Sequence, residues 1–445
     1  MNAPDWQSVI CLYQQIVTTG LLQYLQKQSG VKVRRGIFCA RVVIWLMMLQ
    51  RLQRGATLTT AVQLLIDGAA DPLLQDCHRV RERNISARTG AYCQARQKLP
   101  KLLCVRVSNE IVEQLRQVLA KNEPDQGNVF VLDGSSLELE HCPELLRCYP
   151  PAPNQHGKSH WPVVKIVVAH DVDTAMAQLP EWGSMYGHAA VSEQELGERL
   201  MDRLPPRATL VGDRNFGVFW VAWAAQQRNL NVVLRLTDVR AKKLVAGAIS
   251  QPGEYPVVWK ASRWDGGKKH RFAADQTLTG RMIAARMGRG KSQKWLYLFT
   301  TSALSAAEVV ALYGRRWNIE TDLRSLKRTV RLHHIHARTN DMFEKELLLA
   351  VSAYNFVRAV MCMAARRSGT DPRQLSFTGV LNVVNTAWHR LVDAPNRPAH
   401  EEQFLRMLDI AAQCTLPKRP KRRSFPRAAW PHHNPFPHRH AEKTK

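Results

Sequence analysis

The chain has 445 residues, of which 63 are Lys or Arg and 37 are Asp or Glu, so its formal net charge is +26. Such an excess of positive charge implies a polyanionic partner, either a nucleic acid or an anionic membrane surface. The apolar run from Ile37 to Leu49 is interrupted by Arg41 and is shorter than the ~20 residues that span a bilayer, so we expect no membrane segment. The polar first residues, with Asp5, predict no signal peptide.

The nine cysteines include no Cys-x-x-Cys pair. This pattern favours reduced thiols in a cytosolic protein over a disulfide framework or a zinc site. Composition and periodicity predict six regions along the chain. They are a helical region at 1–125, the first part of an α/β core at 126–237, a β-rich insertion at 238–300, the second part of the core at 301–370, a helical region at 371–415 and a basic disordered tail at 416–445.

Basic residues are dense in the predicted helical region 1–125, at 32–35 and between Arg79 and Arg96. The stretch from Asn84 to Arg96 combines Ser, Thr, Gln, Tyr and Arg at the expected start of a helix. Side chains of these types reach phosphates and base edges in a DNA groove. We therefore expect an all-α DNA-binding region here, with a solvated basic helix face as the alternative.

Residues 126–237 alternate between apolar β-rich runs and helical patterns. Strands are expected at 128–133, 163–170, 175–181, 208–213 and 231–236, and helices at 192–204 and 218–228. Ser192 and Glu195 form a capping-box pattern at the start of the first helix. Three strands followed by αβαβ is the order of an RNase H-like fold.

Two of these strands are expected to end at an aspartate. Asp133 follows the run 129–132 and precedes a Gly-Ser-Ser turn signal, and Asp213 follows the run 208–212. Ligands of open α/β sheets gather beyond the carboxyl ends of the strands, so both aspartates are candidates for chemistry. Taken alone, each could also be a turn former or a helix cap.

Between residues 238 and 300 the pattern is rich in short β-type runs, with strands expected at 255–261, 270–278, 282–287 and 295–300. Three tryptophans lie in or between these runs, namely Trp259, Trp264 and Trp295. Each is expected to pack against the sheet, and by residue type each is also a candidate for stacking on a nucleic-acid base.

The segment from Tyr313 to Lys327 is predicted to form one α-helix, followed by a second helix at 341–366. At about 100° per residue, Tyr313, Arg316, Glu320 and Lys327 fall within an arc of about 60°, beside an apolar stripe. Docking by that stripe would hold one carboxylate at the edge of the core, between cations and a phenol. This arrangement suits a metal-binding carboxylate next to phosphate-binding cations, whereas a solvated row of ion pairs is the structural alternative.

The spacing Tyr-x2-Arg-x3-Glu-x6-Lys of this segment closely resembles the signature of IS4-family DDE transposases, and Trp317 and Arg324 extend the match. The two upstream acids of that family correspond to Asp133 and Asp213 here. The resemblance covers about 128–360 at the level of motifs, and more loosely the N-terminal region, which in the family binds the terminal repeats of the element.

One position departs from the family pattern. The family usually carries Gly or Ala two residues after its second aspartate, and this chain has Asn215. Asn tolerates a left-handed turn almost as readily as Gly, so we interpret the change as conservative.

The resemblance implies an α/β fold with an RNase H-like catalytic core, interrupted by a β-rich insertion and preceded by an all-α DNA-binding region. It implies cut-and-paste transposition, with metal-dependent cleavage at insertion-sequence ends and strand transfer into target DNA. Asp133, Asp213 and Glu320 would be the catalytic metal ligands for two Mg²⁺ ions, which Mn²⁺ can replace, with Asp133 bridging both ions. DNA- and phosphate-binding roles would fall to Tyr313, Arg316, Trp317, Arg324 and Lys327.

The implied partner is double-stranded DNA, as terminal inverted repeats and as target. The resemblance further implies a homodimer in the synaptic complex, no membrane association, and a location in the bacterial cytoplasm on the nucleoid. In the insertion, an aromatic side chain would hold a flipped base.

Three alternatives remain open at this point. The first is an RNase H-like nuclease that cuts without joining, and the second is a domesticated or inactive transposase that only binds DNA. The third is a basic RNA-binding or membrane-surface protein, which explains the charge but not the pattern around Glu320.

The chain ends in a strongly basic segment. From Leu416 onward it carries nine Lys or Arg residues against one acid, Glu442. This composition predicts a disordered tail that adds nonspecific DNA affinity. Its four histidines, at 432, 433, 438 and 440, could alternatively bind a metal.

Overall fold

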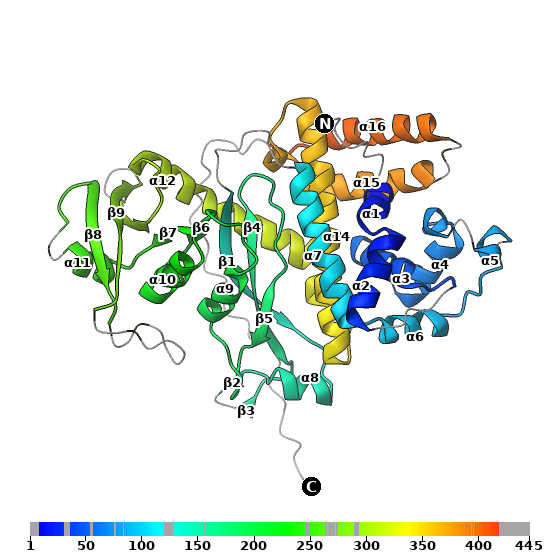
Figure 1. Ribbon diagram of the computed structural model, residues 1–445, viewed down its shortest axis with the longest axis horizontal. Coiled ribbons are helices and arrows are strands. Elements are labelled where there is room, and N and C mark those ends of the chain that lie inside the picture. Colours follow the sequence, from blue (N-terminus) through cyan, green and yellow to red (C-terminus); the bar gives the residue numbers. More distant parts are fainter. Residues whose placement is uncertain are drawn as a thin grey trace, which may run out of the picture.

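The computed structural model shows a sheet-containing half and a helical half, with one long helix between them (Figure 1). It describes residues 9–30, 36–53, 57–74, 77–82, 84–119, 128–154, 157–245, 247, 249–262, 265, 272, 275–288, 293–392, 394 and 396–417. The basic tail, apart from its first two residues, and the segment 32–35 therefore lie outside the described residues, as does Trp264.

One mixed sheet of eight strands forms the α/β half. From one edge to the other its strands are β5 (Glu181–Ser184), β4 (Val163–Asp171), β1 (Val129–Glu138), β6 (Thr209–Gly212), β7 (Asn231–Arg235), β10 (Lys294–Thr300), β9 (Thr277–Met287) and β8 (Gly253–Lys260). The pairs β1–β6 and β6–β7 are parallel and the other pairs are antiparallel. The mixed α/β character predicted from the sequence is confirmed.

Strand β1 is longer than predicted, and the prediction that Asp133 ends it is wrong. Pairing with β6 stops at Val131, but pairing with β4 continues to Glu138, opposite Val163. Gly134 and the two serines that follow it, which resemble a turn in sequence, are therefore held in the strand by antiparallel hydrogen bonds on one side. The strand expected at 175–181 is also displaced, because β5 begins only at Glu181.

The β-rich segment predicted as an insertion does not form a sheet of its own among the described residues. Its helix α11 (Asp238–Val245) is followed by β8, β9 and β10, and β10 pairs with β7, so these strands extend the same sheet. Strand β9 contains the whole of the strand expected at 282–287 and the last two residues of that expected at 270–278, part of which lies outside the described residues. At its Gly280 a Cβ atom would lie 2.6 Å from the ring of Phe299, so this glycine permits close packing and does not mark a turn.

Helices cover the sheet and build the other half. On the sheet side these are α9 (Glu193–Met201), α10 (Phe219–Gln227), α12 (Ala306–Gly314) and the short α8 (Pro143–Cys148). The capping box of α9 forms as predicted, with Ser192 Oγ accepting from the Glu195 N–H at 3.1 Å. The N-terminal helices are α1 (Val9–Ile16), α2 (Thr19–Ser29), α3 (Ala40–Leu52), α4 (Leu58–Ile66), α5 (His78–Arg81), α6 (Gly90–Lys98) and α7 (Lys101–Leu119).

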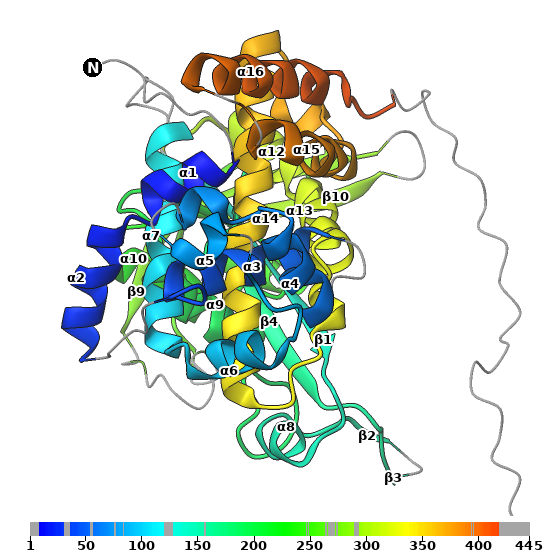
Figure 2. The same ribbon diagram turned by 90° about the vertical axis from the view of Figure 1, so that its right-hand side faces the viewer.

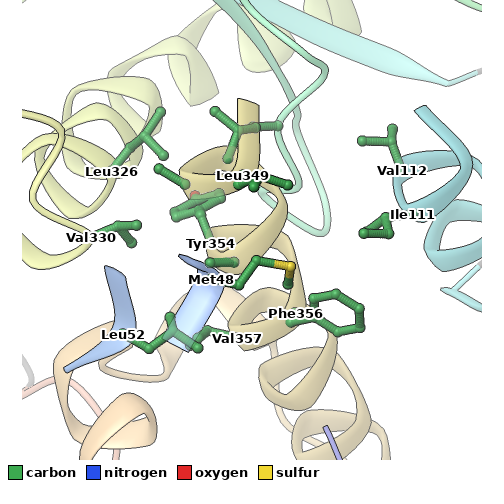
Figure 3. Close-up of a cluster of buried hydrophobic side chains, with 14 of the residues drawn as sticks. Met48, Leu52, Ile111, Val112, Leu326, Val330, Leu349, Tyr354, Phe356 and Val357 are labelled. Atoms are coloured by element: carbon green, nitrogen blue, oxygen red, sulfur yellow. The ribbon is translucent and has the colours of Figure 1, made fainter. Parts of the chain in front are cut away.

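Helix α14 (Asn340–Ser368) joins the two halves. It packs against α3 and α7 on one side and against α15 (Phe377–Val392) and α16 (Arg397–Gln413) at its C-terminal end (Figures 1 and 2). Figure 3 shows how Leu349, Tyr354 and Phe356 of α14 meet side chains from α3 and α7. The helix is long and apolar enough to cross a membrane, yet 94% of its most apolar window is buried in the protein, as in a core helix.

The sheet separates two apolar cores. Phe130 and Leu132 of β1 belong to the core under α9 and α10, whereas Val131 belongs to the core shared with α14. Because successive side chains of a strand point to opposite faces, Asp133 and Ser135 face the α14 side and Gly134 faces α9. This alternation sets which elements can reach each residue around Asp133.

Candidate active site

The segment that carries the signature spacing is not one helix. Helix α12 ends at Gly314 and is followed by a 3₁₀ turn (Arg315–Trp317), by α13 (Asn318–Arg324) and by a π-helical turn (Ser325–Thr329). The prediction of a single α-helix is therefore wrong, and a projection at 100° per residue does not hold across it, because 3₁₀ and π turns contain fewer and more residues per turn. The predicted apolar stripe is nevertheless buried, at Ile319, Leu323, Leu326 and Val330.

Asp133 and Asp213 lie at matching positions of neighbouring parallel strands. Val131 pairs with Val211, so the register continued by two residues brings Asp133 opposite Asp213. One oxygen of each carboxylate accepts a nearby backbone N–H, from Gly134 in β1 at 2.9 Å for Asp133 and from Asn215 at 2.8 Å for Asp213. The other oxygen of each aspartate receives no hydrogen bond from a described residue.

Electrostatics around Asp133 favour an added cation. The pKa of its carboxyl is raised to about 6, mainly by burial; the Gly134 N–H and the guanidinium of Arg316 oppose this shift, and the charges of Asp213 and Glu193 add to it. The carboxylates of Asp133, Asp213 and Glu193 give this region an excess of negative charge. A divalent cation would offset that excess, and oxygen ligands are those that Mg²⁺ prefers.

Glu320 does not complete a closed ligand set. It is exposed on α13, a helix that contacts β1 and buries Ile319 beside it. Within the described part of the chain, no group of three or more His, Cys, Asp or Glu side chains is close enough together to hold a metal ion. The structure thus brings Asp133 and Asp213 together and places the Glu320-bearing segment against their strand, with the third carboxylate still turned to solvent.

Lys327 is held against β1, at the two serines that follow Gly134. From the π-helical turn its ammonium donates to Ser135 Oγ at 3.0 Å and to the Ser136 carbonyl at 2.9 Å. Burial lowers the pKa of this ammonium, and the Glu138 carboxylate opposes that shift. Because Ser135 is two residues from Asp133 on the same face of β1, the cation is held next to the candidate metal site.

The other signature residues form a partly buried aromatic and cationic cluster. Tyr313 is 5% exposed, and neither its hydroxyl nor Nε of Arg316 has a hydrogen-bond partner among the described residues. The Arg316 guanidinium lies 5.1 Å from the centre of the Trp317 ring and 5.9 Å from that of Tyr313. Trp317 is 63% exposed and Arg324 is exposed, so both are available to a partner.

Sequence reasoning missed Glu193, the first residue of α9. Its carboxylate accepts from Asn215 Nδ2 at 2.5 Å, and its side chain lies where a Cβ on Gly134 would be, 2.5 Å from Glu193 Cδ. The capping box identified the start of this helix, but no local signal connects Glu193 with residues of β1 and of the turn after β6. Only the pairing of distant strands brings the three segments together.

Comparison with known proteins now decides the family. The sequence matches the family described as Transposase DDE domain over residues 124–356, which are 233 of its 445 residues. The chain belongs to this transposase family. It is also similar to the transposase InsG for insertion sequence element IS4 of Escherichia coli strain K12, with 26% identity over 314 residues. That alignment covers 67% of this chain and 66% of InsG, slightly under two thirds of the relative's length.

The resemblance to IS4-family DDE transposases is thereby confirmed, and the matched segment contains Asp133, Asp213 and Glu320. One other candidate region is more buried than a DNA-contacting surface would be. In the stretch 84–96, Tyr92 is fully buried and donates to Gln50 Oε1 at 2.8 Å, while Arg96 forms an ion pair with Glu346 of α14. Tyr92 and Arg96 thus stabilise the helical half, whereas Ser86 and Arg88 remain exposed.

The three tryptophans, expected first of all to pack against the sheet, differ in burial. Trp259 is 5% exposed and packs edge-on against Phe219 and Phe299, so it is a core residue of the sheet. Trp295 is partly buried, with Arg286 4.3 Å from its ring centre. Trp264 lies outside the described residues.

Proposed function

We propose that this DDE transposase cleaves DNA at insertion-sequence ends and joins those ends to target DNA by cut-and-paste transposition. The observation that carries the proposal is the position of Asp133 opposite Asp213 on neighbouring parallel strands. The segment with Glu320 packs against β1 on the face where Asp133 lies. Phosphodiester exchange needs a group of carboxylates that can bind metal ions, and cationic side chains next to them that can bind phosphate. Both are present here.

Asp133, Asp213 and Glu320 would hold two Mg²⁺ ions, which Mn²⁺ can replace, with Asp133 common to both. When bound, the ions supply an activated water or 3′-hydroxyl and neutralise charge on the scissile phosphate. The unpaired oxygens of the two aspartates and the raised pKa of Asp133 support this role. Glu320 has to turn from solvent toward the aspartates, and we propose that binding of DNA and metal brings it in.

The cations of the signature would bind phosphates on both sides of the cut. Lys327 uses two of its three N–H donors on β1, so one remains for a phosphate oxygen. Arg316 offers a planar fork beside the Asp133 carboxylate, and the buried hydroxyl of Tyr313 is a further donor. The exposed Trp317 and Arg324 would contact the DNA farther out.

The finer fold that we propose is an RNase H-like core at 126–237 and 301–370. The strand order β5-β4-β1-β6-β7, antiparallel among the first three and parallel from β1 onward, supports it. Residues 238–300 would be the insertion and 1–125 the DNA-binding region, whose described part, 9–30 onward to 84–119, is helical. The region 371–415 would stabilise α14 by packing against it, and the tail 416–445 would add nonspecific affinity for DNA.

The formal charge of +26 supports double-stranded DNA as the partner, both as terminal repeats and as target. Cutting at two ends implies a homodimer in the synaptic complex. These properties go with a protein of the bacterial cytoplasm that works on the nucleoid and not at a membrane.

The test is cleavage of a plasmid that carries the DNA flanking this gene, in Mg²⁺ and in EDTA. Wild type is compared with Asp133→Ala and Glu320→Ala, and with Asp202→Ala as a control whose carboxylate pairs with Arg228 away from the site. We expect metal-dependent cuts at the borders of the element and joined products, lost in the first two variants and retained in the control. Cuts without joined products would indicate a nuclease, border binding without cuts an inactive DNA-binding protein, and cuts that survive both substitutions a different active site.

A further inference from the structure

The turn that presents Asp213 is held by two neighbouring residues of α9. Asn215 Nδ2 donates to Glu193 Oε2 at 2.5 Å, and Gln194 Nε2 donates to the Asn215 carbonyl at 2.6 Å and to its Oδ1 at 3.1 Å. Asn215 in turn donates its backbone N–H to Asp213 Oδ1 at 2.8 Å. A continuous chain of hydrogen bonds therefore runs from Glu193 through Asn215 to the carboxylate of Asp213.

Glu193 also lies against the strand of the other aspartate. Its carboxyl group occupies the space above Gly134, where a Cβ would lie 2.6 Å from Glu193 Oε1. The same Gly134 donates its N–H to Asp133 Oδ1. Glu193 thus touches the residues that bind one oxygen of each aspartate, although it touches neither aspartate by a hydrogen bond.

The contact with Glu193 depends on a residue that departs from the family pattern, because the position of Asn215 usually carries Gly or Ala. A Gly or Ala in place of Asn215 has no side-chain amide, so it cannot donate to a carboxylate on α9. The amide that makes Asn215 a departure is the group that Glu193 binds. The two residues therefore fit one another as a pair.

We propose that Glu193 is a positioning residue of the transposase active site, which fixes the carboxylate of Asp213 through Asn215 and leaves its second oxygen directed to the metal. This inference rests on the proposed metal-dependent function. Residues that orient metal ligands commonly change metal affinity or activity by 10- to 100-fold when they are removed. Glu193 and Asn215 should act as one unit, since each works only through the other.

The experiment is a double-mutant cycle in the full-length protein, with Glu193→Ala, Asn215→Ala and the combination of both. Glu198→Ala is the matched control, because Glu198 lies on the same helix but faces Arg228. Binding of Mn²⁺ without DNA is measured by isothermal titration calorimetry. Cleavage of a duplex with the element's end is then measured as a function of Mg²⁺ concentration.

We expect each single variant to weaken Mn²⁺ binding about 10-fold and to raise the Mg²⁺ concentration for half-maximal cleavage by a similar factor. The double variant should be no worse than the single variants, and Glu198→Ala should match wild type. Unchanged metal binding in Glu193→Ala, or losses that multiply in the double variant, would overturn the inference. A loss as complete as that of Asp213→Asn would also overturn it, because Glu193 would then be a ligand itself.

Failure of the proposed function gives a different result. In that case wild type binds no Mn²⁺ and cuts no duplex, or Asp133→Asn leaves both unchanged. The inference alone fails where wild type binds metal and cuts DNA but the Glu193 and Asn215 variants behave like the control.

Discussion

The carboxylate of Asp322, two residues after Glu320, lies 2.7 Å from Nη2 of Arg358 in the interior of the protein. Its second oxygen binds Nη1 of Arg373 at 2.6 Å, and Asp322 is 1% exposed. Arg373 also donates to the carbonyls of Val172 and Asp171, next to the end of β4. The helix that carries Glu320 is therefore fastened to α14 and to the sheet by one buried acid.

Replacing Asp322 with Ala should lower the free energy of unfolding by about 3–5 kcal/mol, since two buried guanidinium groups lose their counter-charge. Chemical denaturation followed by circular dichroism measures this loss. The control is Asp409→Ala, which removes an exposed, solvent-screened ion pair with Arg367 and should change the stability far less. Equal losses in the two variants would show that the buried network does not fasten α13.

The buried His170 should make stability depend on pH. Burial lowers its pKa to about 4, the nearby Asp322 opposes this, and neither ring nitrogen has a partner among the described residues. Between pH 4 and 6.5 the unfolded chain binds a proton that the folded protein does not. The contribution of His170 to the free energy of unfolding is therefore fully present above pH 6.5. It decreases on acidification, by about 3 kcal/mol at pH 4.

Denaturation at several pH values checks this expectation in His170→Phe, which keeps an aromatic ring against Tyr354. The variant should be less sensitive to pH between 4 and 6.5 than wild type. The same substitution at the exposed His188 should leave the pH profile unchanged. An unaltered profile in His170→Phe would mean that another group causes the acid sensitivity.

Lys327→Met should reduce DNA cleavage about 100-fold, because one phosphate-binding donor beside the metal site is lost. Binding of the DNA ends should change little, since many other cations contribute to it. Gel-shift binding and single-turnover cleavage separate the two effects, with the exposed neighbour Arg328→Met as control. If binding falls as much as cleavage, Lys327 contributes affinity and not rate.

Gly134→Ala should disturb the site with little effect on folding. The new Cβ would meet the flexible end of Glu193, which can move aside, so we expect less than about 1 kcal/mol of lost stability. The displaced Glu193 would release Asn215, and cleavage should fall several-fold at limiting Mg²⁺. Gly90→Ala, where nothing lies within 4 Å of the new atom, serves as control. Full activity of Gly134→Ala at low Mg²⁺ would contradict this account.

Much of the site could be predicted because its signals are local. Apolar runs that lead to Asp133 and Asp213 identified two neighbouring strands, and fixed spacing identified the segment with Glu320. The length of β1 could not be predicted, because Gly134 and the serines after it resemble a turn and only the partner strand β4 keeps them extended. The π-helical turn at Ser325–Thr329 has no sequence signal, and it moves Lys327 onto β1.

The contact between Glu193 and Asn215 was also beyond prediction. It joins the start of α9 to the turn after β6, and its geometry depends on the absence of a side chain at Gly134. The continuity of the sheet was missed for a similar reason. Nothing in the sequence of β10 specifies that its partner is β7.

Among the described residues, β8 forms one edge of the eight-stranded sheet. An unpaired edge strand offers a row of N–H and C=O groups to which a strand of another copy can add. In β8, however, Pro256 stands in the middle of the strand and has no N–H, and the charged Glu254 and Lys260 flank it in exposed positions. The outer strand β8 of this basic protein is therefore a poor template for edge-to-edge aggregation with another copy.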